Sequence, residues 1–132
     1  MKVFVDSSVV FKLVRQMIMW SDLSNSKLLS LTNYRFVISD YVVAEVIRNI
    51  YIKYNYSDKN IIERFMNISN FEFERFDNIY DGIGKYVYDL WDIKILSDCY
   101  FAKCDILLTD NMSDFDIDGI KKNYGIMVQN YL

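Results

Sequence analysis

Short apolar segments alternate along this chain with longer segments of helical periodicity, and that alternation restricts the possible folds more than any other feature. Continuous apolar runs at 2–6, 35–39, 105–109 and 125–129 predict buried strands, and the alternating segment at 71–76 predicts one more. Buried strands that alternate with helices are typical of a parallel sheet covered by helices on both faces. We therefore expect a three-layer α/β/α fold with a central, mostly parallel sheet of four to five strands.

The helical segments are marked by the spacing of apolar residues and by polar residues that can cap them. We expect helices over 8–17, around 23–31 (Leu23, Leu28 and Leu31), from 40 to about 54, around 61–66, over 78–90 and from 92 to about 103. Ser39 is placed to cap the helix that follows the second strand, and Ser57 the helix after that. One face of the longest helix carries Val42, Val43, Val46, Ile47 and Ile50. The segment between the last two strands reads as a loop.

Composition predicts one cytoplasmic domain that spans residues 1–132. The chain has no proline, only four glycines and no repeat that would mark a linker. No apolar run approaches the ~18 residues of a membrane helix, and the first residues do not resemble a signal peptide. Cys99 and Cys104 are too few for a disulfide framework, so we expect buried thiols in a reducing compartment, with no membrane contact.

The absence of histidine narrows the possible chemistry. It excludes Ser-His-Asp triads, Cys-His pairs and histidine-ligated metals, so catalysis must use carboxylates, Lys, Tyr, Ser or Cys. The net charge of −3 also excludes a general basic surface for nucleic acid. Any contact with nucleic acid needs a local basic patch or a metal bridge.

The segment DFDIDG, residues 114–119, has acids at alternate positions and then a glycine, like the first half of a calcium loop. A calcium loop of the EF-hand type needs Glu at its twelfth position, but the twelfth residue from Asp114 is Gly125. Lys121 and Lys122 stand where the cation would be coordinated. The acids of this segment therefore need another explanation.

Several acids fall at the carboxyl edge of the predicted sheet, where parallel α/β sheets bind their ligands. Asp6 follows the first strand, and Asp92 opens the helix that runs antiparallel to the strand at 105–109. Glu45 lies about 9 Å along the helix that leaves the second strand. Asp110, Asn111 and Asp114 follow the strand at 105–109.

Other acids are excluded by the same geometry. Asp105 begins its strand and so lies at the opposite edge. Asp98 is rotated by about 240° from Asp92 on their helix and cannot aim at the same ion. Asp116 and Asp118 lie further out on the loop, where we expect them to be solvated.

Carboxylates gathered at one edge repel one another unless a cation neutralises them. A set of oxygen ligands without histidine or cysteine selects Mg²⁺ or Mn²⁺, which activate water and stabilise the charge that develops on a phosphate. Metal-dependent hydrolysis of a phosphodiester is therefore the leading hypothesis. The alternative is that each acid merely caps a helix or lies in a loop.

Three segments of the chain resemble those of PIN-domain ribonucleases, most closely the VapC-type toxins of toxin–antitoxin pairs. KVFVDSSVVFKLV is similar to the family's opening strand, acid and helix, and VISDYVVAEVIRNI to its second acidic segment. WDIKILSDCYFAKCDILLTDNMSDF is similar to the third and fourth segments read together. The resemblance spans essentially the whole chain, although residues 50–90 carry little of the pattern.

The resemblance implies a set of metal-site residues. By position, Asp6, Glu45 and Asp92 match three acids of the family's metal site. Asn111 stands at the usual fourth acid, where its amide oxygen can ligate a cation but brings no charge, and Asp114 matches a further acid of the same loop. The resemblance thus implies Asp6, Glu45, Asp92 and Asp114 as catalytic residues, with Asn111 beside them as a ligand, and Mg²⁺ or Mn²⁺ as cofactor.

The resemblance also implies a substrate and partners. A metal-activated water would hydrolyse RNA, an antitoxin protein would hold the toxin inactive, and the protein would form a homodimer. The basic residues Lys12, Arg15, Arg48 and Lys53 are placed to touch phosphates or to be solvated. Ser7, Ser8 and Thr109 are placed either to hydrogen-bond the acids or to end their strands and begin their helices.

Three other functions compete with the nuclease. Asn111 motivates a catalytically weakened PIN-like module that binds RNA or protein without cutting. A haloacid-dehalogenase-type phosphatase needs a second acid two residues after Asp6, where Ser8 stands instead, and a receiver domain needs paired acids there and a late Lys. The last two are disfavoured.

Overall fold

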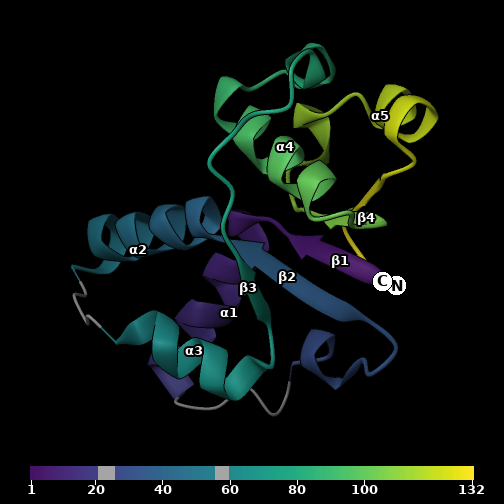
Figure 1. Ribbon diagram of the computed structural model, residues 1–132. Coiled ribbons are helices and arrows are strands. Elements are labelled where there is room, and N and C mark those ends of the chain that lie inside the picture. The colour runs from purple at the N-terminus through teal and green to yellow at the C-terminus, as the bar shows by residue number, and fades with distance from the viewer. Residues whose placement is uncertain (21–25, 56–59) are drawn as a thin grey trace.

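Five parallel strands form one sheet in the computed structural model, which describes residues 1–20, 26–55 and 60–132 (Figure 1). The strands are β1 (Lys2–Val5), β2 (Arg35–Ser39), β3 (Glu72–Glu74), β4 (Ile106–Leu108) and β5 (Met127–Gln129). Their order in the sheet is β3-β2-β1-β4-β5, and every neighbouring pair is parallel. The prediction of a central, mostly parallel sheet of four to five strands is confirmed.

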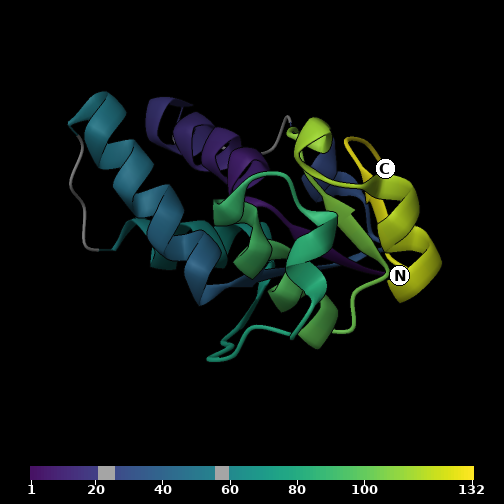
Figure 2. The same ribbon diagram turned by 90° about the horizontal axis from the view of Figure 1, so that it is seen from above.

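Helices cover both faces of the sheet. The α-helices are α1 (Ser7–Trp20), α2 (Asp40–Tyr54), α3 (Ile61–Ser69), α4 (Ile93–Phe101) and α5 (Ile117–Tyr124), and the 3₁₀ turns are η1 (Leu28–Ser30), η2 (Ile83–Tyr86), η3 (Leu90–Asp92) and η4 (Met112–Asp114). α4 and α5 lie on one side of the sheet, and α1 and α3 lie on the other (Figure 1), while α2 runs beside α1 (Figure 2). These are the three layers that the sequence predicts. Within the described ranges, no helix is both long and apolar enough to cross a membrane.

The central strands carry apolar side chains at successive positions because both of their faces are buried. Val3, Phe4 and Val5 of β1 are fully buried, and all three residues of β4 are buried too. The edge strands β3 and β5 have only three residues each and expose some of their side chains. The core of the protein is therefore centred on β1 and β4, whose carboxyl ends lie side by side.

Helix α2 follows the sequence expectation closely. The Ser39 hydroxyl accepts a hydrogen bond from the Val42 amide at 3.4 Å, which is the predicted N-cap. Val42, Val46 and Ile50 are buried, but Ile47, expected on the same face, is 46% exposed. The helix expected around 23–31 appears only as the single turn η1; Leu23 and the proposed cap Ser57 lie outside the described residues.

The prediction of a helix over 78–90 is wrong. Gly82 adopts a left-handed backbone with φ of 83°, and only the short turn η2 follows it. Val87 is extended and forms an antiparallel bridge with Phe115, while the Tyr88 amide donates to the Asp114 carbonyl at 2.7 Å. Backbone hydrogen bonds to the loop after β4 therefore replace the helical ones in this segment.

Helix α5 occupies the segment that reads as a loop in the sequence. The Asp116 side chain caps it by accepting from the Gly119 amide at 3.1 Å, and Gly125 ends it with φ of 68°. The expectation that Asp116 is a solvated loop residue is therefore wrong, whereas Asp118 is exposed. The calcium-like spacing of DFDIDG is thus partly the spacing of a helix cap.

A buried ion pair fixes α4 against the segment that follows β3. The Lys94 ammonium contacts the Asp98 carboxylate at 2.5 Å and also donates to the Phe76 carbonyl at 2.8 Å. Asp98 is fully buried, and among the described residues no donor has good hydrogen-bond geometry to its second oxygen. Burial raises the pKa of Asp98, and the hydrogen bond from Lys94 opposes that rise. The ammonium thus compensates a carboxylate that water cannot reach.

The substitution Lys94→Met is expected to lower the free energy of unfolding by about 3 kcal/mol, because it leaves the buried carboxylate unpaired. Urea unfolding at neutral pH measures this loss, with exposed Lys122→Met as the matched control. The double substitution Lys94→Met with Asp98→Leu is expected to recover most of the loss. A single variant no less stable than its control would contradict this account of the pair.

Candidate active site

The reversal of strand order in the sheet lies between β1 and β4. The chain proceeds from β1 to β2 on one side and later returns to β4 on the other. Ligands of such sheets bind outside the carboxyl ends of the strands at this reversal. Asp6 follows β1 there, Thr109 follows β4, and the Asp6 amide donates to the Leu108 carbonyl at 2.9 Å.

Asp6 is almost completely buried, and hydrogen bonds fix both of its carboxylate oxygens. The Thr109 hydroxyl donates to Oδ2 at 2.6 Å, and the Ser7 amide donates to Oδ1 at 2.6 Å. Burial raises the pKa of Asp6, and the charge of Glu45 adds to that rise, while the hydrogen bonds from Thr109 and Ser7 lower it. Of the two roles open to Thr109, the structure shows that it orients an acid.

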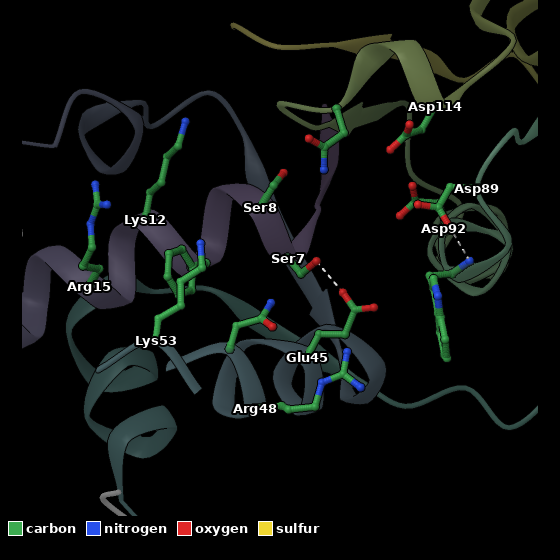
Figure 3. Close-up of a pocket in the computed structure, with 14 residues that line it drawn as sticks. Ser7, Ser8, Lys12, Arg15, Glu45, Arg48, Lys53, Asp89, Asp92 and Asp114 are labelled. Atoms are coloured by element: carbon green, nitrogen blue, oxygen red, sulfur yellow. Dashed lines mark hydrogen bonds between the residues drawn. The ribbon is translucent and has the colours of Figure 1, made fainter. Parts of the chain in front are cut away.

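Ser7 connects Asp6 with Glu45 of α2. The Ser7 hydroxyl donates to Glu45 Oε2 at 2.5 Å (Figure 3) and lies 3.2 Å from Asp6 Oδ1. The hydroxyl has one proton, so it cannot donate to both carboxylates at once, and the shorter distance favours Glu45. Ser8 is more weakly placed, with its hydroxyl 3.4 Å from Asp6 Oδ2.

A second group of acids comes from the loop before α4 and the loop after β4. Carboxylate oxygens of Asp89, Asp92 and Asp114 all lie within 4.8 Å of one another. Asp89 caps η3 by accepting from the Trp91 amide at 3.1 Å, and Asp92 ends the same turn. The backbone bond between Tyr88 and Asp114 holds the two loops together, so these three acids are positioned by main-chain contacts.

The described part of the chain places no basic side chain against this second group of acids. Burial, the charge of Asp6 and the hydrogen bond and charge of Asp114 together raise the pKa of Asp92 to about 8. In the part of the chain that the structure describes, no lysine or arginine forms an ion pair with Asp89, Asp92 or Asp114. A divalent cation that prefers oxygen ligands fits such a group.

Four of the five residues that the sequence singles out border one cavity of about 490 Å³: Glu45, Asp92, Asn111 and Asp114. Asp6 is buried behind its wall. The five do not form a single tight cluster, because Ser7 joins Asp6 to Glu45 while Asp92 and Asp114 group with Asp89. The backbone N–H of Asn111 donates to the Thr109 hydroxyl at 3.0 Å, which places Asn111 next to the residue that orients Asp6.

Asp89 is the acid that sequence reasoning missed. The sequence feature that could have identified Asp89 is its spacing of three residues from Asp92. The prediction of a helix over 78–90 places Asp89 at the end of that helix, whereas in the structure it begins the turn that ends at Asp92. Asp105, which the sequence excludes by position, does lie elsewhere, because it accepts from the Lys2 amide at the opposite edge of the sheet. Asp110 lies at the carboxyl edge, but it pairs with Lys12 at 2.6 Å.

Basic side chains of α1 and α2 border the same cavity as the acids. These are Lys12, Arg15, Arg48 and Lys53 (Figure 3). Lys12 is paired with Asp110, and the Lys53 ammonium lies 5.2 Å from the centre of the Phe11 ring. Arg15 and Arg48 form no ion pair with the described residues. The cavity thus combines an acidic end with a basic wall, an arrangement that can accept a cation at one end and an anion along the wall.

Comparison with known proteins supports the fold. No protein-family model matches the chain, and no curated protein matches it. Among solved structures, a chain from the crystal structure of VapBC2 of Rickettsia felis, bound to a DNA fragment from their promoter, superposes with a TM-score of 0.62. The match covers 100% of both chains at 18% sequence identity, so it shows that the two share a fold.

The substitution Asp92→Asn is expected to stabilise the metal-free protein at pH 7 by at least about 1 kcal/mol, because Asp92, with its pKa raised to about 8, must take up a proton when the protein folds, whereas Asn need not. Thermal unfolding in a chelator measures this gain, with the exposed Asp81→Asn as control. Millimolar Mn²⁺ is expected to raise the melting temperature of the wild type more than that of Asp92→Asn. Equal responses of the two proteins to Mn²⁺ would show that Asp92 takes no part in binding a cation.

Proposed function

We propose that this chain is a single PIN-like domain, residues 1–132, that hydrolyses RNA with the help of a divalent metal ion. The observation that carries the proposal is the uncompensated acidic group of Asp89, Asp92 and Asp114 in the same cavity as four basic side chains. An RNA backbone brings negative phosphates that suit the basic wall. A bound cation would neutralise the acids and contact a phosphate at the same time.

The residues that would hold the ion follow from the donor set. Asp92 and Asp114, with Asp89 beside them, supply grouped oxygens, and Asp6 and Glu45 complete the set that the resemblance to PIN domains implies. Oxygen ligands of this kind select Mg²⁺ or Mn²⁺. When bound, such an ion supplies an activated water and stabilises the charge that develops on the phosphate.

The protein's own side chains have two further tasks in this proposal. Thr109 and Ser7 hold the Asp6 carboxylate in one orientation, so the metal site is formed before the substrate arrives. Arg15 and Arg48, which are not engaged in ion pairs with described residues, bind phosphates of the strand along the wall formed by α1 and α2. Positioning and charge stabilisation are the main contributions a phosphodiesterase needs from its scaffold.

The likeness to a VapBC2 chain, together with the resemblance to VapC-type toxins, extends the proposal to partners. We infer that the protein is the toxin of a toxin–antitoxin pair, forms a homodimer and acts in the cytoplasm. Helix α2 carries apolar side chains exposed to solvent, among them Tyr51, Ile52 and Tyr54, which suit a protein contact. Purified protein that is monomeric, and that binds no product of an adjacent gene, would count against this extension.

Asn111 favours a second candidate, a PIN-like module that binds RNA or protein but cuts weakly or not at all. The residue borders the cavity where the family pattern has an acid, so one negative charge is missing from the metal site. Calorimetric titration with Mn²⁺ separates the two candidates. No binding up to millimolar Mn²⁺ would support the inert module.

RNA cleavage in the presence of Mn²⁺ is expected to fall at least about 10-fold in Asp6→Asn and in Asp92→Asn, because each variant loses one carboxylate of the proposed metal site. Asp81→Asn, an exposed acid outside the cavity, serves as control and should cut like the wild type. Asn111→Asp should bind Mn²⁺ more tightly by restoring the missing charge. Equal cleavage by the wild type, Asp6→Asn and Asp92→Asn would refute the nuclease proposal.

The double substitution Arg15→Gln with Arg48→Gln is expected to weaken RNA binding and to reduce its dependence on salt. Each lost phosphate contact should lower the slope of log K against log salt by about 0.7 for a single strand. Fluorescence anisotropy over a series of salt concentrations measures the slope. The control is Lys121→Gln with Lys122→Gln on the exposed side of α5, and a slope that changes equally in both pairs would contradict a local phosphate site.

A further inference from the structure

We propose that Trp91 is a stacking platform for an unpaired base, so that the protein binds single-stranded RNA with one base held beside the acids. The inference rests on the proposed function, because it names the form of RNA that the same cavity takes. Trp91 borders the cavity together with Asp89, Asp92 and Asp114. It therefore adds an aromatic surface to a site otherwise described by its charges.

The exposure of Trp91 is unusual for its size. The side chain is 67% exposed, although burying an indole is one of the larger apolar gains available to a folding chain. The backbone at this position is nevertheless held on both sides. The Trp91 amide donates to Asp89 at 3.1 Å, and its carbonyl accepts from the Tyr41 hydroxyl at 3.0 Å. A fixed main chain thus presents the indole to solvent at the edge of the site.

The indole face is also available for stacking. Other aromatic rings of this protein pack on one another, for example Tyr80 on Tyr100 and Tyr100 on Tyr124. Among the described side chains, no aromatic ring stacks on Trp91 and no cation lies over it. Stacking of one nucleobase on an exposed aromatic side chain contributes to binding whatever the base, because every base has a π face.

The charges around the cavity indicate the path that a bound strand takes. The basic wall of α1 and α2 attracts phosphates, and the acids at the other end tolerate a phosphate only with a cation between them. Trp91 adjoins that acidic end through Asp92, its neighbour in sequence. A strand whose backbone follows the basic wall into the acidic end therefore has a base beside the indole. Bases of a duplex are paired and stacked within it, so an unpaired base is the one that can stack on Trp91.

Two neighbours of Trp91 suggest the competing explanation. Tyr88 is 70% exposed and Leu90 is 82% exposed, so the three side chains could form a patch for a protein partner. Neither Tyr88 nor Leu90 borders the cavity, however, so of these three side chains only Trp91 belongs to the charged site. We therefore assign Trp91 to RNA, and Leu90 serves as the matched control.

The test measures binding of a fluorescently labelled, single-stranded oligoribonucleotide of about ten nucleotides by anisotropy. All variants are built in the Asp6→Asn background, so that cleavage does not interfere, and circular dichroism checks their folding. Trp91→Leu, which keeps an apolar side chain without a π face, is expected to raise the Kd about 5- to 150-fold. Trp91→Phe is expected to retain most of the affinity, and Leu90→Ala to bind like its parent. A duplex of the same sequence should bind weakly, and equally to Trp91→Leu and to its parent.

Binding that is unchanged in Trp91→Leu, or reduced as much in Leu90→Ala, would overturn the inference. So would a loss of affinity that is the same for duplex and single strand. Cleavage assays of the wild type decide the nuclease proposal separately. A wild type that cuts RNA combined with a Trp91→Leu variant of unchanged affinity would remove the stacking platform alone, whereas no cleavage with a selective loss of single-strand binding would retain the platform and remove the nuclease.

Discussion

Repulsion among carboxylates at the carboxyl edge of the sheet is the constraint on which the account of this protein depends. Asp92 is buried close to Asp89, Asp114 and the charge of Asp6, and its pKa is raised to about 8. Such a group is unfavourable for folding unless it is protonated or paired with a cation. The described part of the chain provides no basic partner for it, although basic side chains border the same cavity. That separation of charge is the basis on which a divalent ion and an RNA strand are proposed as ligands.

The architecture produces this crowding through a few main-chain contacts. β1 and β4 are neighbours, so the residues that follow them meet at one edge. The Val87–Phe115 bridge and the Tyr88–Asp114 hydrogen bond then tie the loop before α4 to the loop after β4. Since backbone bonds rather than flexible side chains set these distances, the acids cannot relax far apart. The same rigidity presents Trp91 to solvent at the edge of the site.

Much of this could be predicted from sequence because it depends on local pattern. Buried central strands such as β1 have a continuous apolar run, and Ser39 has the chemistry of a helix cap. These patterns are sufficient to predict the parallel sheet and the residues at its carboxyl edge. The turns at 83–92 and helix α5 could not be predicted in the same way. The first is set by hydrogen bonds to a segment some 28 residues away in sequence, as between Val87 and Phe115, and the second by a cap, Asp116, in a segment whose acids resembled ligands. The wrong helix over 78–90 also concealed Asp89, because its role depends on the turn that the sequence did not indicate.

The central claim is that oxygens of Asp92 and Asp114 share a divalent cation. Anomalous diffraction from crystals soaked in Mn²⁺ tests it most directly, because the metal is then located independently of any activity. The account predicts an anomalous peak at about 2.0–2.3 Å from a carboxylate oxygen of each residue, in the cavity and in front of Asp6. Crystals with Mn²⁺ bound elsewhere, or with no peak between these two side chains at saturating metal, would contradict it.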